Sequence, residues 1–339
     1  MSSEVPPGRE HLYMNVEHPE HPVAAAQEAD ASDAARKYAH YVIRGPLFGV
    51  AAQGEGDGRR WRVISAVNDG SAQESRDGLN SYLWFRALND TDDRSVRREL
   101  LAAVARLETD PVNEVTAAGT RYRIVRCDEF LYRNDEGPEP PRPTDEEPGE
   151  RNWDLWAKGP RLDDGFVIDH IAATSAMTAA ERLALMGLRY RSPRYPAEVR
   201  DDSRRAVVSH AGVVLLPPAF RVLESTGTGW EPASAMQAGP HSARKALVYL
   251  LTQAWPVMYD LDEAGRASYA RAAREFQAAG EADVLRLDDG RDLCIARMRR
   301  LVRMGPDGPE TARPSDEDPY GPTRMHPPMD EHGTVTHES

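Results

Sequence analysis

The stretch "GPEPPRPTDEEP" (residues 137–148) occurs a second time in the chain, as "GPETARPSDEDP" (residues 308–319). Eight of the twelve positions are identical, and Thr144/Ser315 and Glu147/Asp318 are conservative pairs. A repeated phrase of this length calls for a search for a longer internal repeat, because a repeat changes the expected architecture.

The similarity continues backwards from both phrases in the same order along the chain. At spacings of 168 to 172 residues the matched pairs are Arg126/Arg297, Gly119/Gly290, Leu83/Leu251, Leu79/Leu247, Trp61/Trp230, Phe48/Phe220 and His40/His210. Short loop insertions account for the drift in spacing. The chain is therefore predicted to be a tandem duplication.

The predicted organisation has five parts. They are a flexible N-terminal tail (1–24), repeat 1 (25–148), a connector with a short helix (149–194), repeat 2 (195–319) and a flexible C-terminal tail (320–339). Both tails are rich in proline, histidine and acidic residues, a composition typical of mobile segments.

Each repeat is predicted to be an α+β unit with the order helix, hairpin, helix, helix, hairpin, closed by a Pro-rich acidic arm. The first helix is expected around Ala34, Tyr38 and Val42 in repeat 1 and around Val199 to His210 in repeat 2. The strands "LFGVAA" (47–52) and "AFRVLE" (219–224) follow, each with a glycine-rich turn and a return strand.

Local signals set the expected ends of several elements. Asp92 and Asp262 are expected to cap the second helix of each helical pair, and Pro256 to end the helix before it. Pro232 favours an edge strand. In the connector, Thr178 and Glu181 form a capping-box pattern before "RLALMGL" (182–188).

The repeated phrase itself predicts a short, stiff, extended arm, because proline fixes φ and biases the preceding residue towards extended backbone. Each arm presents one arginine, Arg142 or Arg313, which can pair with a carboxylate. We expect each arm to pack on its own repeat, against Trp61 or Trp230, and to clamp the last strand. The alternative is that the arms are free and bind something else.

Composition limits the function classes. The chain has 339 residues and a net charge of −13, and its length suggests two domains. Its two cysteines are expected to be reduced, buried thiols in a cytoplasmic protein. The N-terminus lacks a signal peptide and no apolar run reaches membrane-spanning length, so no membrane association is expected. The acidic residues lie mainly in tails and linkers, which argues weakly against nucleic acid.

No catalytic motif, dinucleotide or phosphate loop, or metal-ligand pattern stands out. We therefore expect no catalytic residue, no cofactor and no metal. His18 and His21 lie in Pro-rich sequence without thiolate partners. His40 and His210 are either histidines at helix C-termini or a symmetric pair of functional residues.

Arginines cluster in the predicted strands, as in "RYRIVR" (121–126) and "RMRRLVR" (297–303). Three interpretations are open: a nucleic-acid surface, strands facing the protein's own acidic segments, or a solvated face.

The phrases "RYRIVRCDEF" (121–130), "AGVVLLPPAFRVLE" (211–224), "WPVMYDLDEA" (255–264) and the two acidic phrases resemble a family of hypothetical proteins found in actinobacteria. The resemblance covers nearly the whole chain apart from the tails. It implies a bacterial cytosolic setting and transfers no catalytic residue.

The sequence does not identify an activity. We expect a non-enzymatic module that binds a protein partner or regulates it, with Trp61, Trp230, His40, His210, Arg142 and Arg313 as candidate interaction residues. The alternatives are a small-ligand binder or enzyme with a site between the repeats, and an arginine-mediated nucleic-acid binder.

Overall fold

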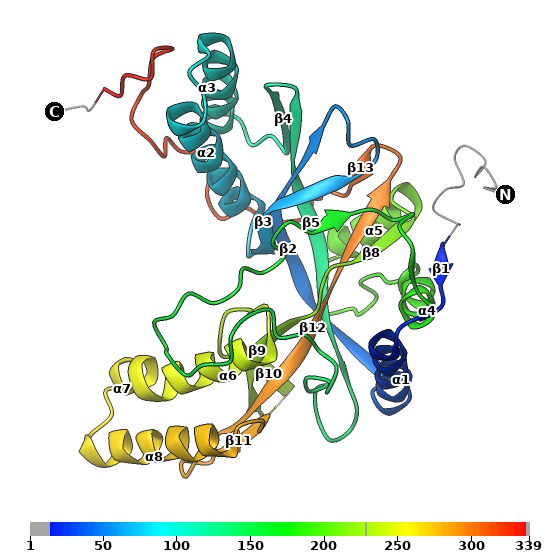
Figure 1. The fold of residues 1–339 in the computed structure, drawn as a ribbon, viewed down its shortest axis with the longest axis vertical. Coiled ribbons are helices and arrows are strands. Elements are labelled where there is room, and N and C mark those ends of the chain that lie inside the picture. Colours follow the sequence, from blue (N-terminus) through cyan, green and yellow to red (C-terminus); the bar gives the residue numbers. More distant parts are fainter. Residues whose placement is uncertain (1–13, 228, 337–339) are drawn as a thin grey trace.

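The computed structural model describes residues 14–227 and 229–336 and mixes helices and strands in an α+β fold (Figure 1). One central sheet runs in the order β10-β9-β12-β5-β2-β3-β6, and β4, β8, β11 and β13 pair at its sides. The main strands are β2 (His40–Gly54), β3 (Trp61–Asp69), β5 (Thr120–Arg133), β6 (Val167–Ile168), β9 (Ala219–Thr226), β10 (Gly229–Pro232) and β12 (Asp292–Gly305).

The long strands β5 and β12 form an antiparallel pair at the centre of the sheet. Cys127 pairs with Val302, and Leu131 pairs with Met298. The short strands beside them are β4 (Glu114–Ala117), β8 (Gly212–Leu215), β11 (Val284–Arg286) and β13 (Gly308–Pro309). The strand containing Pro232 lies at the edge of the sheet, as predicted, because proline cannot donate to a further strand.

Two groups of helices lie at opposite ends of the long strands (Figure 1). One consists of α2 (Ala72–Asn89) and α3 (Arg94–Thr109), and the other of α6 (Pro240–Tyr249), η2 (Leu250–Ala254), α7 (Trp255–Met258) and α8 (Glu263–Ala279). Each group covers its own apolar cluster, one around Leu83 and Leu100 and the other around Leu251 and Phe276. Burying one such side chain stabilises the fold by about 1.5–3 kcal/mol.

The remaining elements lie around one side of the sheet. They are β1 (Val16–Glu17), α1 (Pro22–Lys37), β7 (Thr174–Ser175), α4 (Ala176–Leu185) and α5 (Ala197–Ser209). β1 pairs with β7 in parallel, which brings α1 beside α4. α1 differs from α5 in having no buried residue, whereas α5 buries Asp202, Ser203 and Ala206.

Several predicted ends differ from the structure. The first helix ends at Lys37, so Val42 lies in β2, where its backbone pairs with Leu131. Asp93, not Asp92, caps α3, and Ser175, not Thr178, caps α4 through a bond from the Thr178 amide. Neighbouring polar residues compete for a cap, and tertiary packing decides between them. The Asp262 cap of α8 is confirmed.

Pro256 does not end its helix, contrary to the prediction. The π-helical segment η2 comes directly before α7, and the helix continues to Met258. A π-helical turn changes the hydrogen-bond register, so a proline that follows it is accommodated without ending the helix.

Residues 326–335 of the predicted C-terminal tail lie along α2 and α3. Trp84 Nε1 donates to the Pro327 carbonyl at 3.1 Å, and the Trp84 and His326 rings stack with centroids 4.6 Å apart. Arg98 pairs with Glu331 at 2.8 Å. Residues 1–13 of the N-terminal tail lie outside the described residues.

None of the helices in the described part of the chain is both long and apolar enough to span a membrane. Cys127 and Cys294 are buried free thiols, as predicted. Burial raises the pKa of Cys294 to about 12, and it raises the pKa of Cys127 as well. Neither thiol is therefore activated as a nucleophile.

Candidate ligand-binding cavity

We call residues 25–148 and 195–319 the two halves of the chain. The acidic phrase at the end of each half, residues 137–148 or 308–319, contacts the long strand of the other half. Arg297 of β12 donates from Nε to both carboxylate oxygens of Asp145 at 3.0 Å. Arg126 of β5 donates from Nε to Asp316 at 2.8 Å. The backbone repeats this exchange, because the amides of Arg297 and Arg126 donate to the carbonyls of Glu139 and Glu310, both at 2.8 Å.

The glycines that begin the phrases lie against the tryptophan of the other half. A Cβ added to Gly137 would lie 3.6 Å from the Trp230 ring, and one added to Gly308 would lie 2.7 Å from Trp61 Nε1. Gly308 also has φ of +126°, so both its backbone and its surroundings require glycine. The expectation that each arm packs on its own tryptophan is therefore wrong: β5 and β12 are neighbours, so a chain leaving one strand lies over the other.

The phrases also contact their own halves, and one of these contacts reaches the first helix of each half. The Thr144 amide donates to Asp30 of α1 at 3.1 Å, and the Ser315 amide donates to Asp202 of α5 at 2.9 Å. Each phrase thus joins its own first helix to the strand of the other half.

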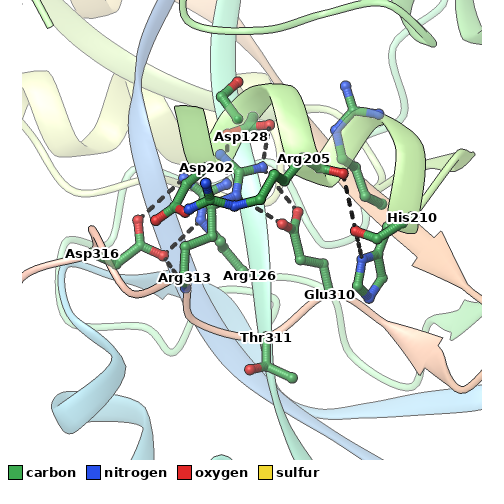
Figure 2. Close-up of polar contacts among 12 residues, drawn as sticks. Arg126, Asp128, Asp202, Arg205, His210, Glu310, Thr311, Arg313 and Asp316 are labelled. Carbon is green, nitrogen blue, oxygen red and sulfur yellow. Dashed lines mark hydrogen bonds and ion pairs between the residues drawn. The ribbon is translucent and has the colours of Figure 1, made fainter. Parts of the chain in front are cut away.

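One group of charged residues around the second phrase is closely packed. We call Arg126, Asp128, Glu310, Arg313 and Asp316 the filled cluster; Figure 2 shows how its side chains converge. Arg126 donates from Nη1 to Asp128 at 2.7 Å and from Nε and Nη2 to Asp316, so all three of its nitrogens have partners. Burial alone would raise the pKa of Asp128, but Arg126 and Arg313 hold it below its usual value.

The chain after α4 completes the filled cluster. The Tyr190 hydroxyl donates to Asp128 at 3.0 Å, and Arg303 donates to the carbonyls of Met186 and Leu188. Tyr190 thereby lies at Asp128, the partner of Arg126, and Met186 and Leu188 lie at Arg303.

The residues 171 positions away form a second group, which we call the open cluster: Arg297, Arg299, Glu139, Arg142 and Asp145. Four of the five positions keep the residue type, but Asp128 is matched by Arg299. Arg299 pairs with Glu181 of α4 through two bonds of 2.6 and 3.0 Å. Within residues 14–227 and 229–336, Arg297 Nη1 therefore lacks the carboxylate that Arg126 Nη1 has.

Two buried polar atoms of the open cluster have no hydrogen-bond partner among the described residues. They are Arg297 Nη1 and Glu139 Oε2, on residues that are 6% and 1% exposed. Burial and the neighbouring Arg299 lower the pKa of Arg297. The filled cluster keeps one such atom, Arg313 Nη1, but Arg313 does not line the cavity described next.

A cavity of about 1750 Å³ adjoins the open cluster. Its walls are α1, α4, the first acidic phrase and residues 160–166, and Arg297, Arg299 and Glu139 are among its lining residues. The small side chains Ala24, Ala31 and Ala34 of α1 face it. The open cluster therefore adjoins a cavity, whereas Tyr190 contacts Asp128 in the filled cluster.

The predicted interaction residues fall in separate places. Trp61 is buried at the start of β3, with the Arg121 and Arg123 guanidinium groups 5.1 and 4.8 Å from its ring centroid. Trp230 lies in β10, where its carbonyl accepts from Arg44 at 2.8 Å. Neither lines the cavity.

The two histidines do not occupy matching sites. His40 begins β2, whereas His210 caps the C-terminus of α5 and contacts Ser209 through Nδ1 at 3.0 Å. Burial lowers the pKa of His210. Their spacing of 170 residues is two less than the 172 that relates Asp30 to Asp202 in the preceding helices.

Arg142 and Arg313 each pair with the glutamate three residues earlier. Arg142 donates to Glu139 at 2.6 Å, and Arg313 donates twice to Glu310, at 2.7 and 3.0 Å. Of the six predicted residues, only Arg142 lines the cavity.

The strand arginines pair with the protein's own carboxylates, which supports the second of the three interpretations. Arg123 pairs with Glu114 and Asp307, Arg297 with Asp145, and Arg299 with Glu181.

The sequence analysis did not select Arg297, Arg299 or Glu139 as site residues. One signal was present: at the 171-residue spacing Asp128 meets Arg299, a reversal of charge inside an otherwise preserved set. Its meaning depends on tertiary contacts, because only they show which nitrogen loses its partner. No group of three or more His, Cys, Asp or Glu side chains suited to a metal ion occurs in residues 14–227 and 229–336.

Comparison with known families matches residues 21–319 to a family of unknown function, DUF5954, so the chain belongs to that family. No curated protein and no solved structure matches it.

Proposed function

We propose that the cavity beside the open cluster binds a small polar ligand. The observation that carries the proposal is the contrast between two matched arginines. All three nitrogens of Arg126 are bonded, whereas Arg297 Nη1, in the wall of a large cavity, has no partner in the described structure. The proposal concerns binding and assigns no reaction.

Physical chemistry favours a ligand at this place. A buried donor or acceptor without a partner costs about 1–3 kcal/mol, and more when the group is charged. A ligand that bonds Arg297 Nη1 and Glu139 Oε2 would remove this cost on binding. Concave sites with a few convergent polar groups are the usual places for small ligands.

We also infer that the two halves, 25–148 and 195–319, are copies of one ancestral unit, with 149–194 as the connector between them. Support comes from contacts that recur at one spacing: Asp145 with Arg297 and Asp316 with Arg126. In this view the connector supplies Tyr190 to one copy of the cluster and Glu181 to the other, where Arg297 Nη1 has no partner among the described residues and is left for a ligand.

The test uses two tryptophan substitutions in α1. Ala31 lines the cavity, whereas Ala26 of the same helix is exposed and does not. We expect native mass spectrometry of protein purified from its host to show a bound small molecule that Ala31→Trp abolishes and Ala26→Trp retains. The proposal would be contradicted if both variants retained the ligand equally. It would also be contradicted if no metabolite shifted the melting temperature of the wild type in a thermal-shift screen.

A second candidate function, binding of a protein partner, is favoured by exposed apolar side chains near α7. Trp156, Val257 and Met258 are 77%, 74% and 67% exposed, and Trp156 lies beside Tyr249 with ring centroids 6.3 Å apart. Exposed apolar patches mark interaction surfaces. A Trp156→Ser, Val257→Asp variant should lose a partner that the wild type retains in a pull-down, with Ala31→Trp as the control that keeps it.

A further inference from the structure

We propose that the ligand is a short peptide or a similar zwitterion, bound with its single carboxylate on Arg297. This inference rests on the proposed function, since it names the class of ligand for the same cavity. Three observations carry it: Arg297 Nη1 and Glu139 Oε2, each without a hydrogen-bond partner in the described part of the chain, and the distribution of charge around the cavity.

The position of the carboxylate follows from the filled cluster. There, Asp128 accepts the bond from Arg126 Nη1 at 2.7 Å. In the open cluster Arg299 stands at the matched position and is itself neutralised by Glu181. A ligand carboxylate at Arg297 Nη1 would therefore take the role that Asp128 has, with the short charge-assisted bond that arginine forms with carboxylates.

The ligand also needs a hydrogen-bond donor and positive charge. Glu139 Oε2 can only accept, so an amide, ammonium or hydroxyl group of the ligand would satisfy it. Nine acidic residues and four arginines line the cavity, and Glu17, Glu20, Glu146 and Asp164 are exposed. The exposed carboxylates repel a polyanion such as a nucleotide and attract ammonium groups.

The size of the cavity favours several residues over one. Sites for drug-sized ligands span roughly 300–1000 Å³. At about 1750 Å³, this cavity exceeds that range and would leave a single amino acid loosely held. A short peptide can place its C-terminal carboxylate at the buried Arg297 and its amino groups near the exposed acids.

The experiment compares a mixed-sequence tetrapeptide library with free C-terminal carboxylates against the same library as C-terminal amides. Binding to the full-length protein is measured by native mass spectrometry and by thermal shift. We expect the free acids to bind about tenfold more tightly or better, because the amides lack the charge for Arg297. The same comparison with Arg297→Gln should show no such preference.

The outcomes separate the two proposals. Equal binding of acids and amides, abolished by Ala31→Trp, would overturn the carboxylate assignment and leave the cavity as a ligand site. If neither library binds but the host-purified protein carries a different molecule, the assignment of a peptide ligand is overturned and the cavity remains a ligand site. The wild-type comparison remains decisive if Arg297→Gln fails to fold. Glu139→Gln should weaken the binding of both libraries but keep the difference in affinity between free acids and amides.

Discussion

At the scale of single residues, identical side chains have different environments in the two halves. Arg126 and Arg297 both donate to an aspartate of the opposite phrase, but Arg126 has a second buried carboxylate partner, Asp128. Removing one partner of a buried pair is costly because it leaves an uncompensated charge. The two arginines should therefore differ in their contribution to stability.

We expect Arg126→Met to lower the free energy of unfolding by about 3–5 kcal/mol, since it leaves both Asp128 and Asp316 without their main partner. Arg297→Met should cost less, about 1–3 kcal/mol, because only Asp145 loses a partner. Urea denaturation of the two variants measures the difference. An equal loss would show that the two clusters are energetically equivalent.

Acid should destabilise the protein through the buried carboxylates. The pKa values of Asp128 and Glu181 are held below their ordinary values in the folded state by Arg126 and Arg299, although burial opposes this. Their stabilisation is therefore present above the unfolded pKa values near 4 and is lost as pH falls through the lower folded values.

The free energy of unfolding should thus decrease steadily below about pH 4, as followed by urea melts at several pH values. Asp128→Asn and Glu181→Gln should each reduce the slope of this decrease. A slope unchanged in both variants would mean that other carboxylates carry the acid sensitivity.

At the scale of elements, the last acidic residue of each phrase caps a helix of the other half. Glu147 accepts from the His241 amide at the start of α6 at 2.6 Å, and Asp318 accepts from the Gln73 amide at the start of α2 at 2.8 Å. A carboxylate at this end satisfies a free amide and complements the helix dipole. Each phrase therefore fixes both a strand and a helix.

Asp318→Ala should destabilise the protein more than Glu147→Ala. Asp318 also pairs with Arg76 at 2.7 Å, and the Arg76 side chain is 3% exposed, so its loss leaves a buried charge. We expect about 2–3 kcal/mol for Asp318→Ala and about 1 kcal/mol for Glu147→Ala in thermal or urea unfolding. The exposed neighbour Glu146, changed to alanine, should have an effect below about 0.5 kcal/mol.

At the scale of the whole molecule, the crossing of the phrases makes each half depend on the other. β5 and β12 pair along the centre of the sheet, and residues 308–319 supply partners for Arg126 and Gln73 of the first half. A half chain would leave a long strand edge and buried arginines exposed. Such an edge promotes association with another strand.

Fragments 1–194 and 195–339 should consequently fail to unfold cooperatively when prepared alone and should copurify when expressed together. Calorimetry of each fragment and size-exclusion chromatography of the mixture test this. A fragment 1–194 that melts within a few degrees of the full chain would show that the halves fold independently.

The predictability of the fold varied with the range of the interactions involved. The Asp262 cap and the edge strand at Pro232 depend on a few neighbouring residues, and they could be predicted. Val42 and Pro256 were assigned wrongly because a sheet partner and a π-helical turn, respectively, override the local signal. The candidate site was largely missed, since Arg297 and Glu139 become notable only through the contacts they lack.

The sequence by itself determined the matched phrases, their arginines and aspartates, and the reversal of charge between Asp128 and Arg299, because these are properties of residue order. Only the tertiary structure decided that each phrase crosses to the other half, that Tyr190 contacts Asp128 in the filled cluster, and that Arg297 lines a cavity. The physical reason is that β5 and β12 pair between segments some 170 residues apart, and no local signal specifies such a contact.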